Sequence, residues 1–263
     1  MNRAENSGMD LRVMNGLAVA LFAIFVGSVL VAATRWVSNR SVFALHSITV
    51  LGDVTHANAP TVRAHVVSRV TGSFFSVDLA RTRTVLEAMP WVRHAVVHRD
   101  FPNKLRVQLQ EHQVAAYWGD ANEPRLLNTF GEVFDANVGE VEVEVEDLPH
   151  LNGPLAQSAT VLAAYRALAP QFAAMDLTLE SLDLTNQGSW RIGLSGGATL
   201  EAGRGDLEQI QTDVAQFLKT LTRVLARYQR PAGALESADL RYKNGYAIRL
   251  RGVSTLAAVA PTP

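Results

Sequence analysis

The sequence contains no cysteine among its 263 residues. This absence excludes disulfide bonds, thiolate metal ligands and a cysteine nucleophile. Net charge is nearly absent as well, because 24 lysine and arginine residues balance 25 aspartate and glutamate residues. The charge balance therefore gives no sign of a nucleic-acid partner.

Ionisable side chains are also missing from one long stretch near the N-terminus. The 22 residues between Arg12 and Arg35 carry none. As a helix rising about 1.5 Å per residue, this stretch reaches about 33 Å, enough to cross a hydrocarbon core of about 30 Å. It lacks the polar face of a soluble core helix, and Trp36 follows at the position of the lipid headgroups. The sequence predicts a transmembrane helix over residues 13–35, after a tail of residues 1–12.

A cleaved secretory signal is the alternative for this segment. Val31-Ala32-Ala33 resembles a small-residue cleavage site, and Arg3 and Arg12 supply a positive n-region. The apolar core of a signal is usually about 7–15 residues long, and this one is longer. The length favours a retained anchor.

The charges that flank the predicted span do not set its orientation. Arg3 and Arg12 precede it while Arg35 and Arg40 follow it, so the positive-inside rule decides nothing. A short tail before a first apolar segment usually stays inside while the C-terminal bulk is exported. The architecture therefore predicts a single-pass type II protein with a cytoplasmic N-terminus.

Residues 43–112 have the pattern of a compact mixed domain. Apolar residues alternate with polar ones where strands are expected and recur at helical spacing where helices are expected. The predicted elements are a strand at 48–50, a helix from Pro60, a helix from about Ser76 to Pro90, and strands at 91–99 and 105–109. Their order is β-α-α-β-β.

Residues 113–253 have the pattern of a mixed, mostly antiparallel β domain with two main helices. Two short strands around a glycine turn are expected at 125–134, and further strands at 182–184, 190–194 and 198–202. After a loop at 148–154, the first helix should turn these side chains inward: Leu155, Leu162, Tyr165, Leu168 and Phe172. The second helix should start at Asp206, with Gln209 as its capping partner.

A hairpin is predicted near the C-terminus. Asn244-Gly245 separates two alternating apolar runs, and this dipeptide favours a two-residue turn because both residues accept a positive φ. Leu240 and Tyr242 would lie in the first strand and Tyr246, Ile248 and Leu250 in the second. Residues 254–263 are expected to be disordered.

The sequence carries no recognisable catalytic or metal-binding motif. The seven histidines are scattered without HExxH spacing, and no GxSxG or Walker motif occurs. His94 and His98 share a face of a predicted strand, but no acidic ligand lies beside them in the sequence. We expect no enzyme activity, no metal and no cofactor. The enzymatic alternative, an exported hydrolase acting on the cell wall, would need a nucleophile or a metal cluster.

An acidic segment runs from Glu140 to Asp147, with glutamates at alternate positions up to Glu146. On one face of a strand, these carboxylates could bind a cation or a basic partner. The other interpretation is a solvated loop or an edge strand whose charges discourage aggregation. The second interpretation is favoured.

Several short motifs follow one another along about 200 residues. They are Met89-Pro90-Trp91-Val92, Phe101-Pro102 followed by Leu105, Leu127-Asn128 followed by Gly131-Glu132-Val133-Phe134, Leu148-Pro149 with Gly153-Pro154, Gly203-Arg204-Gly205-Asp206, and Asp239-Leu240-Arg241-Tyr242-Lys243-Asn244-Gly245. Each motif is weak alone. In this order and spacing, the chain resembles the FtsQ/DivIB family of bacterial cell-division proteins over almost its whole length.

The resemblance implies an α+β fold in which residues 43–112 form a POTRA domain and residues 113–253 the β domain of the family. It implies a protein that spans the inner membrane once, with a cytoplasmic N-terminus and periplasmic domains. The family has no known enzymatic activity. Its members join the divisome at the septum and bind FtsB and FtsL, through which they link early division proteins to those that control septal peptidoglycan synthesis.

The resemblance also implies that FtsB binds at the C-terminal edge of the β domain. By matching, the binding residues would be Tyr242, Asn244, Gly245, Tyr246, Ala247, Ile248 and Arg249. A final strand with one neighbour leaves outer N–H and C=O groups to which a partner strand can add. Tyr242 and Tyr246 would supply aromatic anchors. The alternative is that both tyrosines belong to the core of the sheet.

The chain departs from the family pattern at three places. Phe101 stands where many relatives have Trp before the proline, and His112 follows Glu111 where many have Pro. Some relatives carry an Arg that assists partner binding at the position of Gln187-Gly188. Whether this chain makes a second, charged contact with the partner is therefore an open question. The alternative function is a POTRA-containing factor for envelope assembly or secretion, which would show tandem POTRA repeats or a C-terminal barrel; neither pattern is present.

Overall fold

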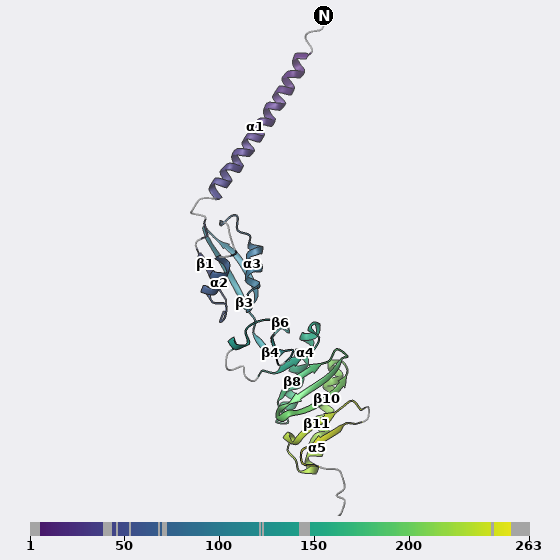
Figure 1. Cartoon of the computed structure of the whole chain (residues 1–263). Helices are drawn as coiled ribbons and strands as arrows, with labels where there is room; N and C mark the ends of the chain where they lie inside the picture. Colours follow the sequence, from purple (N-terminus) through teal and green to yellow (C-terminus); the bar gives the residue numbers. More distant parts are fainter. Residues whose placement is uncertain are drawn as a thin grey trace, which may run out of the picture. The chain divides into compact units, whose positions relative to one another are not determined.

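The computed structural model describes residues 6–38, 44–45, 47–52, 54–67, 69, 73–120, 122, 124–141, 148–242 and 245–253. The chain divides into two compact units, Met1–Glu111 and His112–Pro263 (Figure 1). The predictions for the carboxylates of residues 142–147, for Asn244 and for the tail 254–263 lie outside the described residues.

The apolar stretch near the N-terminus forms one long helix, α1 (Asn6–Ser38). Residues Val13–Trp36 are long and apolar enough to cross a membrane, and every side chain of that range is exposed. The hydroxyls of Ser28 and Thr34 donate to the backbone carbonyls of Ile24 and Val31, at 2.8 and 2.9 Å, so the helix itself provides acceptors for these two hydroxyls. The helix begins before the predicted span, within the expected tail.

The rest of the first unit has the predicted β-α-α-β-β order. Its elements are β1 (Ser47–Leu51), α2 (Ala59–Val67), α3 (Leu79–Glu87), β2 (Val92–Asp100) and β3 (Lys104–Glu111). The sheet order is β1-β3-β2, with β1 parallel and β2 antiparallel to β3. Val62, Leu86 and Val107 are fully buried in the core shared by the helices and the sheet.

Helix α3 starts later than the sequence pattern suggested. Asp78 adopts an extended backbone and its side chain accepts a hydrogen bond from the backbone N–H of Arg81, at 3.0 Å. An aspartate in this position satisfies one of the free N–H groups of the first turn. The cap therefore sets the start of the helix at Leu79 rather than near Ser76.

The second unit is built on a nine-stranded mixed sheet among the described residues. Its order is β12-β11-β10-β9-β8-β7-β4-β5-β6, and five of its eight strand pairs are antiparallel. The strands are β4 (Val114–Trp118), β5 (Arg125–Asn128), β6 (Val133–Phe134), β7 (His150–Asn152), β8 (Leu179–Leu184), β9 (Ser189–Leu194), β10 (Ala198–Arg204), β11 (Leu235–Asp239) and β12 (Ala247–Leu250). The helices are α4 (Ser158–Ala173) and α5 (Leu207–Tyr228), with short 3-10 turns at Val138–Glu140, Leu155–Gln157, Ser195–Gly197 and Ala232–Ala234. Both long helices share one core with the strands.

Helix α5 begins as predicted from its capping residue. The Asp206 side chain accepts a hydrogen bond from the backbone N–H of Gln209, at 2.9 Å. The Gln209 side chain donates instead to Asp213, one turn further on, at 2.9 Å. Only one half of the predicted reciprocal capping pair is therefore formed.

The predicted loop at 148–154 contains a strand, which corrects the expectation. Strand β7 pairs in parallel with β4 on one side and with β8 on the other. A strand of three residues is too short to show alternation in the sequence, and its pairing partners are remote. Leu155, predicted to face inward, is 57% exposed, because the helix starts only at Ser158.

The C-terminal hairpin exists, but its turn differs from the prediction. Asp239 pairs with Ala247, so residues 240–246 form the connection and neither Leu240 nor Tyr242 lies in a strand. The backbone N–H of Leu240 donates to the carbonyl of Glu201, at 2.9 Å, which draws the chain towards β10.

The motif Leu127-Asn128 followed by Gly131-Glu132 has a structural explanation. The Asn128 side chain is fully buried; its oxygen accepts hydrogen bonds from the backbone N–H groups of Phe130 and Glu132, both at 2.9 Å. Its amide nitrogen lies 2.7 Å from Glu132 Oε2 and 2.8 Å from His112 Nδ1. Asn128 thus organises the turn between β5 and β6, in which Gly131 has a φ of +83°.

Candidate protein-interaction site

Strand β12 forms one edge of the nine-stranded sheet. Among the described strands it pairs only with β11, in an antiparallel register that places Ile248 opposite Ala238. In an antiparallel ladder, alternate residues turn their backbone groups away from the neighbouring strand. The outer side of β12 therefore presents N–H and C=O groups to which another strand can add.

The side chains of β12 alternate between the core and the solvent. Leu250 is 5% exposed and Ile248 packs against the core, whereas Ala247 and Arg249 are exposed. Arg249 Nη1 lies 3.5 Å from Glu236 Oε1 of the neighbouring strand. Ile248 and Leu250 anchor the edge strand to the core. Ala247 and Arg249 would lie next to the side chains of a strand that pairs with β12.

The two tyrosines predicted as anchors differ in environment. Tyr246 is half-buried, and its ring lies edge-on to that of Phe217 in α5, with centroids 5.0 Å apart. Tyr242 is 61% exposed. The alternative that both are core residues is therefore wrong for Tyr242 and holds in part for Tyr246.

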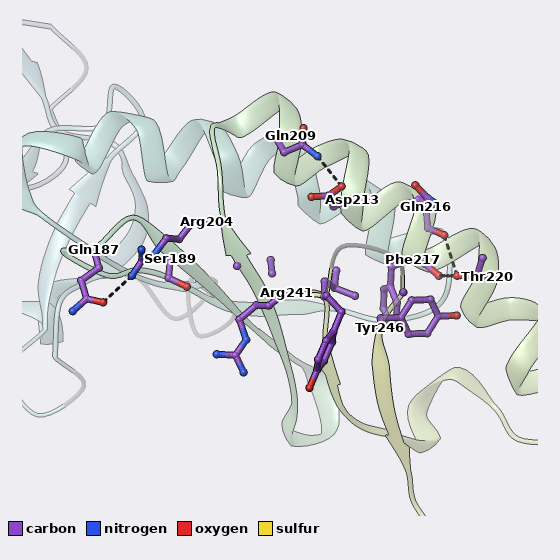
Figure 2. Close-up of a pocket in the computed structure, with 15 residues that line it drawn as sticks. Gln187, Ser189, Arg204, Gln209, Asp213, Gln216, Phe217, Thr220, Arg241 and Tyr246 are labelled. Carbon is purple, nitrogen blue, oxygen red and sulfur yellow. Dashed lines mark hydrogen bonds between the residues drawn. The ribbon is translucent and has the colours of Figure 1, made fainter.

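A groove of about 1190 Å³ lies beside this edge. Residues of α5 form one wall, and the β8–β9 turn, β10 and the segment 240–246 contribute the rest (Figure 2). The lining is mostly polar, and it consists of Gln187, Ser189, Ala202, Gly203, Arg204, Gln209, Asp213, Gln216, Phe217, Thr220, Leu240, Arg241, Tyr242, Gly245 and Tyr246.

Arg241 is held in place by Asp239. Its Nε donates to Oδ1 at 2.8 Å and its Nη2 to Oδ2 at 2.6 Å, and its backbone N–H donates to Oδ1 at 3.0 Å. The side-chain hydrogen bond from Arg241 is the main reason that the pKa of Asp239 lies below its ordinary value. The Arg241 side chain is still 60% exposed, so a positioned cation stands at the groove.

A second cation lies beside the Gln187-Gly188 turn, which itself carries no Arg. Arg204 Nη2 donates a hydrogen bond to Gln187 Oε1 at 3.2 Å, and both residues line the groove (Figure 2). Gln187 stands in the turn where some relatives were expected to carry an Arg. The structure therefore supplies a guanidinium beside this turn from β10.

The predicted partner-binding residues fall into two groups in the structure. Tyr242, Gly245 and Tyr246 line the groove. Ala247, Ile248 and Arg249 form the edge strand. Asn244 lies outside the described residues.

Among the groove residues that sequence reasoning missed are Arg204, Arg241 and Phe217. Arg204 and Arg241 each stand within a motif that was used only for the resemblance, and the sequence does not reveal that they line one groove. Nothing in the sequence indicates that Phe217 of α5 contacts Tyr246.

The histidines do not assemble a metal site in the part of the chain that the structure describes, where no three His, Asp or Glu residues are placed to hold an ion. The fold does bring a carboxylate to His94, whose Nδ1 lies 3.0 Å from Glu87 Oε1. Burial alone would raise the pKa of Glu87, but hydrogen bonds from Arg83 and from the backbone of Ala95 outweigh it and lower the pKa. Glu87 thus joins α3 to β2, which is a structural role.

Comparison with known proteins adds a separate finding. Residues 43–112 match the family described as "POTRA domain, FtsQ-type", and residues 116–241 match "Cell division protein FtsQ/DivIB, C-terminal". The chain is 40% identical over 247 residues to the cell division protein FtsQ of Burkholderia pseudomallei, a match that covers 94% of this chain and 96% of the relative. Its identity to the proteins of the same name is 35% in Thiomonas arsenitoxydans (93% and 89% covered) and 34% in Bordetella pertussis (92% and 92% covered). The second family match ends at Arg241, so β12 lies beyond it.

Proposed function

Because the chain belongs to the FtsQ/DivIB family of cell division proteins, we propose that it is a scaffold of the divisome that binds FtsB and FtsL. The family is not known for enzymes. The observation that carries the proposal is the open edge of β12 next to a groove with two arginines. Through these partners, the protein would link early to late division proteins and influence septal peptidoglycan synthesis.

The binding mode that we propose is strand addition to β12. Main-chain hydrogen bonds along the outer edge give the affinity, and the alternate side chains of the partner strand give the specificity. The core contacts of Ile248 and Leu250 support this mode, because an edge that is already fixed loses little conformational entropy on binding. Tyr242, exposed beside the groove, is the aromatic anchor for the partner.

The groove extends the site with charge. Arg241 and Arg204 are both positioned by intramolecular hydrogen bonds, and a guanidinium forms charge-assisted hydrogen bonds with a carboxylate. A partner segment that carries an acidic residue next to its strand therefore fits this surface. Arg204 takes the place of the charged contact that Gln187-Gly188 lacks.

The remaining parts of the proposal concern location. We propose that α1 anchors the chain in the inner membrane with residues 1–12 in the cytoplasm, and that the POTRA domain (43–112) and the β domain (113–253) lie in the periplasm at the septum. The length and hydropathy of Val13–Trp36 support the anchor. Partners with similar anchors would then meet β12 at a high effective concentration.

The test is co-purification of the full chain with FtsB. We expect that Tyr242→Ala and Arg241→Glu each weaken binding by about 30-fold or more, the scale of an interface hot spot. Tyr246→Glu and Ile248→Pro should abolish binding, although both also touch the core. Unchanged binding by all four variants would overturn the site.

Two residues outside the site provide matched controls. Tyr228 at the end of α5 is 43% exposed, and Arg227 beside it is also exposed. Tyr228→Ala and Arg227→Glu make the same chemical changes away from the groove. Binding should stay at the wild-type level in both, and equal losses in controls and site variants would point to a general effect of charge or stability.

A further inference from the structure

Two large aromatic rings protrude from one end of the POTRA domain. Phe75 is 50% exposed and Phe101 is 72% exposed, while Phe74 between them is buried. Phe74 meets Phe75 edge-on with centroids 5.2 Å apart, and Phe101 edge-on with centroids 5.8 Å apart. Single exposed apolar residues are ordinary, but two rings on a common base form a patch. We call Phe75 and Phe101 on Phe74 the aromatic tip.

The backbone under the aromatic tip is fixed. The backbone N–H groups of Ser76 and Val77 both donate to the carbonyl of Ser73, at 3.1 and 2.9 Å. From β2, Arg99 donates to the carbonyls of Phe74 and Val77, both at 2.8 Å. These hydrogen bonds give Phe75 and Phe101 a rigid support. A binding surface needs such a support to keep its contact residues in place.

The covalent chain keeps the aromatic tip close to the end of α1. Ala44 pairs by an isolated bridge with Ser73, the residue next to Phe74. Helix α1 ends at Ser38, and six residue steps at full extension reach at most about 21 Å. The apolar stretch itself ends at Trp36. The six residue steps from Ser38 to Ala44 thus keep the aromatic tip close to the membrane boundary in any orientation of the domain.

Basic residues adjoin the aromatic tip. Lys104 is exposed at the start of β3, three residues after Phe101, and Arg106 lies on the same strand. Asp100, the acidic residue of this turn, forms an ion pair with Arg106 at 3.0 Å. The sign of the remaining Lys104 charge suits the anionic headgroups of a lipid surface.

We propose that the aromatic tip inserts into the headgroup layer of the membrane that α1 spans. The inference rests on the membrane anchoring in the proposed function and on no partner protein. Phe side chains of segments that lie on a membrane surface enter the boundary between headgroups and acyl chains to a depth of about 5–10 Å. The short tether raises the local concentration of lipid around the tip far above that of any soluble partner. The contact supports the POTRA domain at a second point besides α1.

The absence of cysteine makes a direct test practical. The full chain is reconstituted in vesicles of phosphatidylethanolamine and phosphatidylglycerol, with one cysteine introduced as Phe75→Cys, Phe101→Cys or Gln110→Cys and labelled with a polarity-sensitive fluorophore. Gln110 is exposed near the other end of β3. We expect labels at 75 and 101 to be quenched by lipid-borne nitroxides and shielded from aqueous iodide, and the label at 110 to behave in the opposite way.

A second set of variants separates insertion from a folding defect. A label at Asn103→Cys should be shielded in the parent chain and lose its shielding in the Phe75→Ser, Phe101→Ser double variant. Phe130→Ser removes an exposed ring from the β domain, where Phe130 is 53% exposed, and should leave the shielding unchanged. If the label at position 103 lost its shielding equally in the double variant and in Phe130→Ser, the role of the aromatic tip would be overturned.

The outcomes distinguish this inference from the anchoring on which it rests. Extraction of the chain from the vesicles by alkaline carbonate would overturn both. Retention of the chain with labels at 75 and 101 as open to iodide as the label at 110 would overturn the insertion alone. Shielding that arises only after a partner protein is added would assign the tip to a protein contact and overturn the lipid proposal.

Discussion

The ring of Tyr246 lies edge-on to the ring of Phe217, with centroids 5.0 Å apart and ring planes at 89°. The contact joins the residue that precedes β12 to helix α5. Aromatic pairs in this geometry add about 0.5–1.5 kcal/mol beyond the effect of burial. It fixes where β12 begins, and so presents the open edge of the sheet in one conformation.

Removal of this contact should loosen β12. We expect Tyr246→Ala to cost about 1–2 kcal/mol, because the ring is only half-buried, and to speed amide hydrogen exchange in residues 247–250. Tyr246→Phe keeps the ring pair and should exchange like the parent. Hydrogen exchange measured by mass spectrometry compares the two, and equal protection in Tyr246→Ala would show that α5 does not hold the strand.

Asp239 should matter for partner binding more than for stability. The Asp239→Asn change removes the charge that positions Arg241, at a small cost in stability because the Arg241 side chain is mostly exposed. Binding of the FtsB periplasmic segment should weaken about tenfold, since Arg241 must then be ordered on association. Titration calorimetry measures the affinity. Asp135→Asn, an exposed carboxylate elsewhere in the domain, should bind like the parent.

Gly131 and Gly188 distinguish the two ways in which an added methyl group can destabilise the fold: backbone strain and steric overlap. Both have positive φ, +83° and +76°, but a Cβ at Gly131 would lie 2.5 Å from Ala159 Cα, whereas nothing lies within 4 Å at Gly188. Gly188→Ala should cost about 1 kcal/mol from the backbone alone. Gly131→Ala should cost at least about 3 kcal/mol, because α4 must move as well. Thermal unfolding of both variants checks the order, which similar costs would contradict.

Glu111 should make the first domain sensitive to acid. Its carboxylate accepts hydrogen bonds from the backbone N–H groups of Ala57 at 2.5 Å and of Thr55 and His56, both at 3.0 Å. Burial, the largest single effect, would raise the pKa of Glu111, but these hydrogen bonds outweigh it and hold the pKa below its ordinary value of 4.5. Glu111→Gln should cost about 2 kcal/mol in urea unfolding at pH 7.

The pH dependence follows from the direction of that shift. Because the folded pKa is the lower one, the unfolded chain binds more protons, so this stabilisation is complete above about pH 4.5 and is lost as the pH falls through the folded pKa. Hydrogen exchange in residues 54–62 should rise below pH 4.5 in the parent. The rise should be absent in Glu111→Gln and present in Glu180→Gln, a control at an exposed carboxylate.

Asn128→Asp tests the buried turn of the β domain. The change deletes both amide donors and places a carboxylate within the reach of Glu132, in a site with no exposure. The new carboxylate would be buried next to the carboxylate of Glu132, which is exposed, and the two negative charges would repel each other. We expect a loss of about 3 kcal/mol or more at pH 7, mainly from the burial of the new charge. The loss should shrink as the pH approaches 4, because protonation restores a donor. A pH-independent loss would contradict this account.

Local patterns predicted much of the fold. The alternation of Leu105, Val107 and Leu109 indicated β3, and all three side chains are buried. Asp206 marked the start of α5, because capping is a matter of four consecutive residues. Such elements were predictable since their signals lie within one helical turn or one strand.

Other features depend on residues far apart in the chain. Strand β7 was missed because its three residues are stabilised by β4 and β8, not by their own pattern. The two-residue turn at Asn244-Gly245 was wrong, because Asp239 pairs with Ala247 and Leu240 continues the pairing with β10 through its bond to Glu201. No local signal reports on either partner.

The sequence by itself determined that a long apolar helix precedes two α+β domains, since uninterrupted hydrophobicity and apolar periodicity are properties of consecutive residues. It also indicated the family. Only the tertiary structure decided that β12 is an edge, that Tyr242 is exposed while Tyr246 is half-buried, and that Arg204 and Arg241 line one groove. These depend on strand order and packing, which bring together groups that lie up to dozens of residues apart.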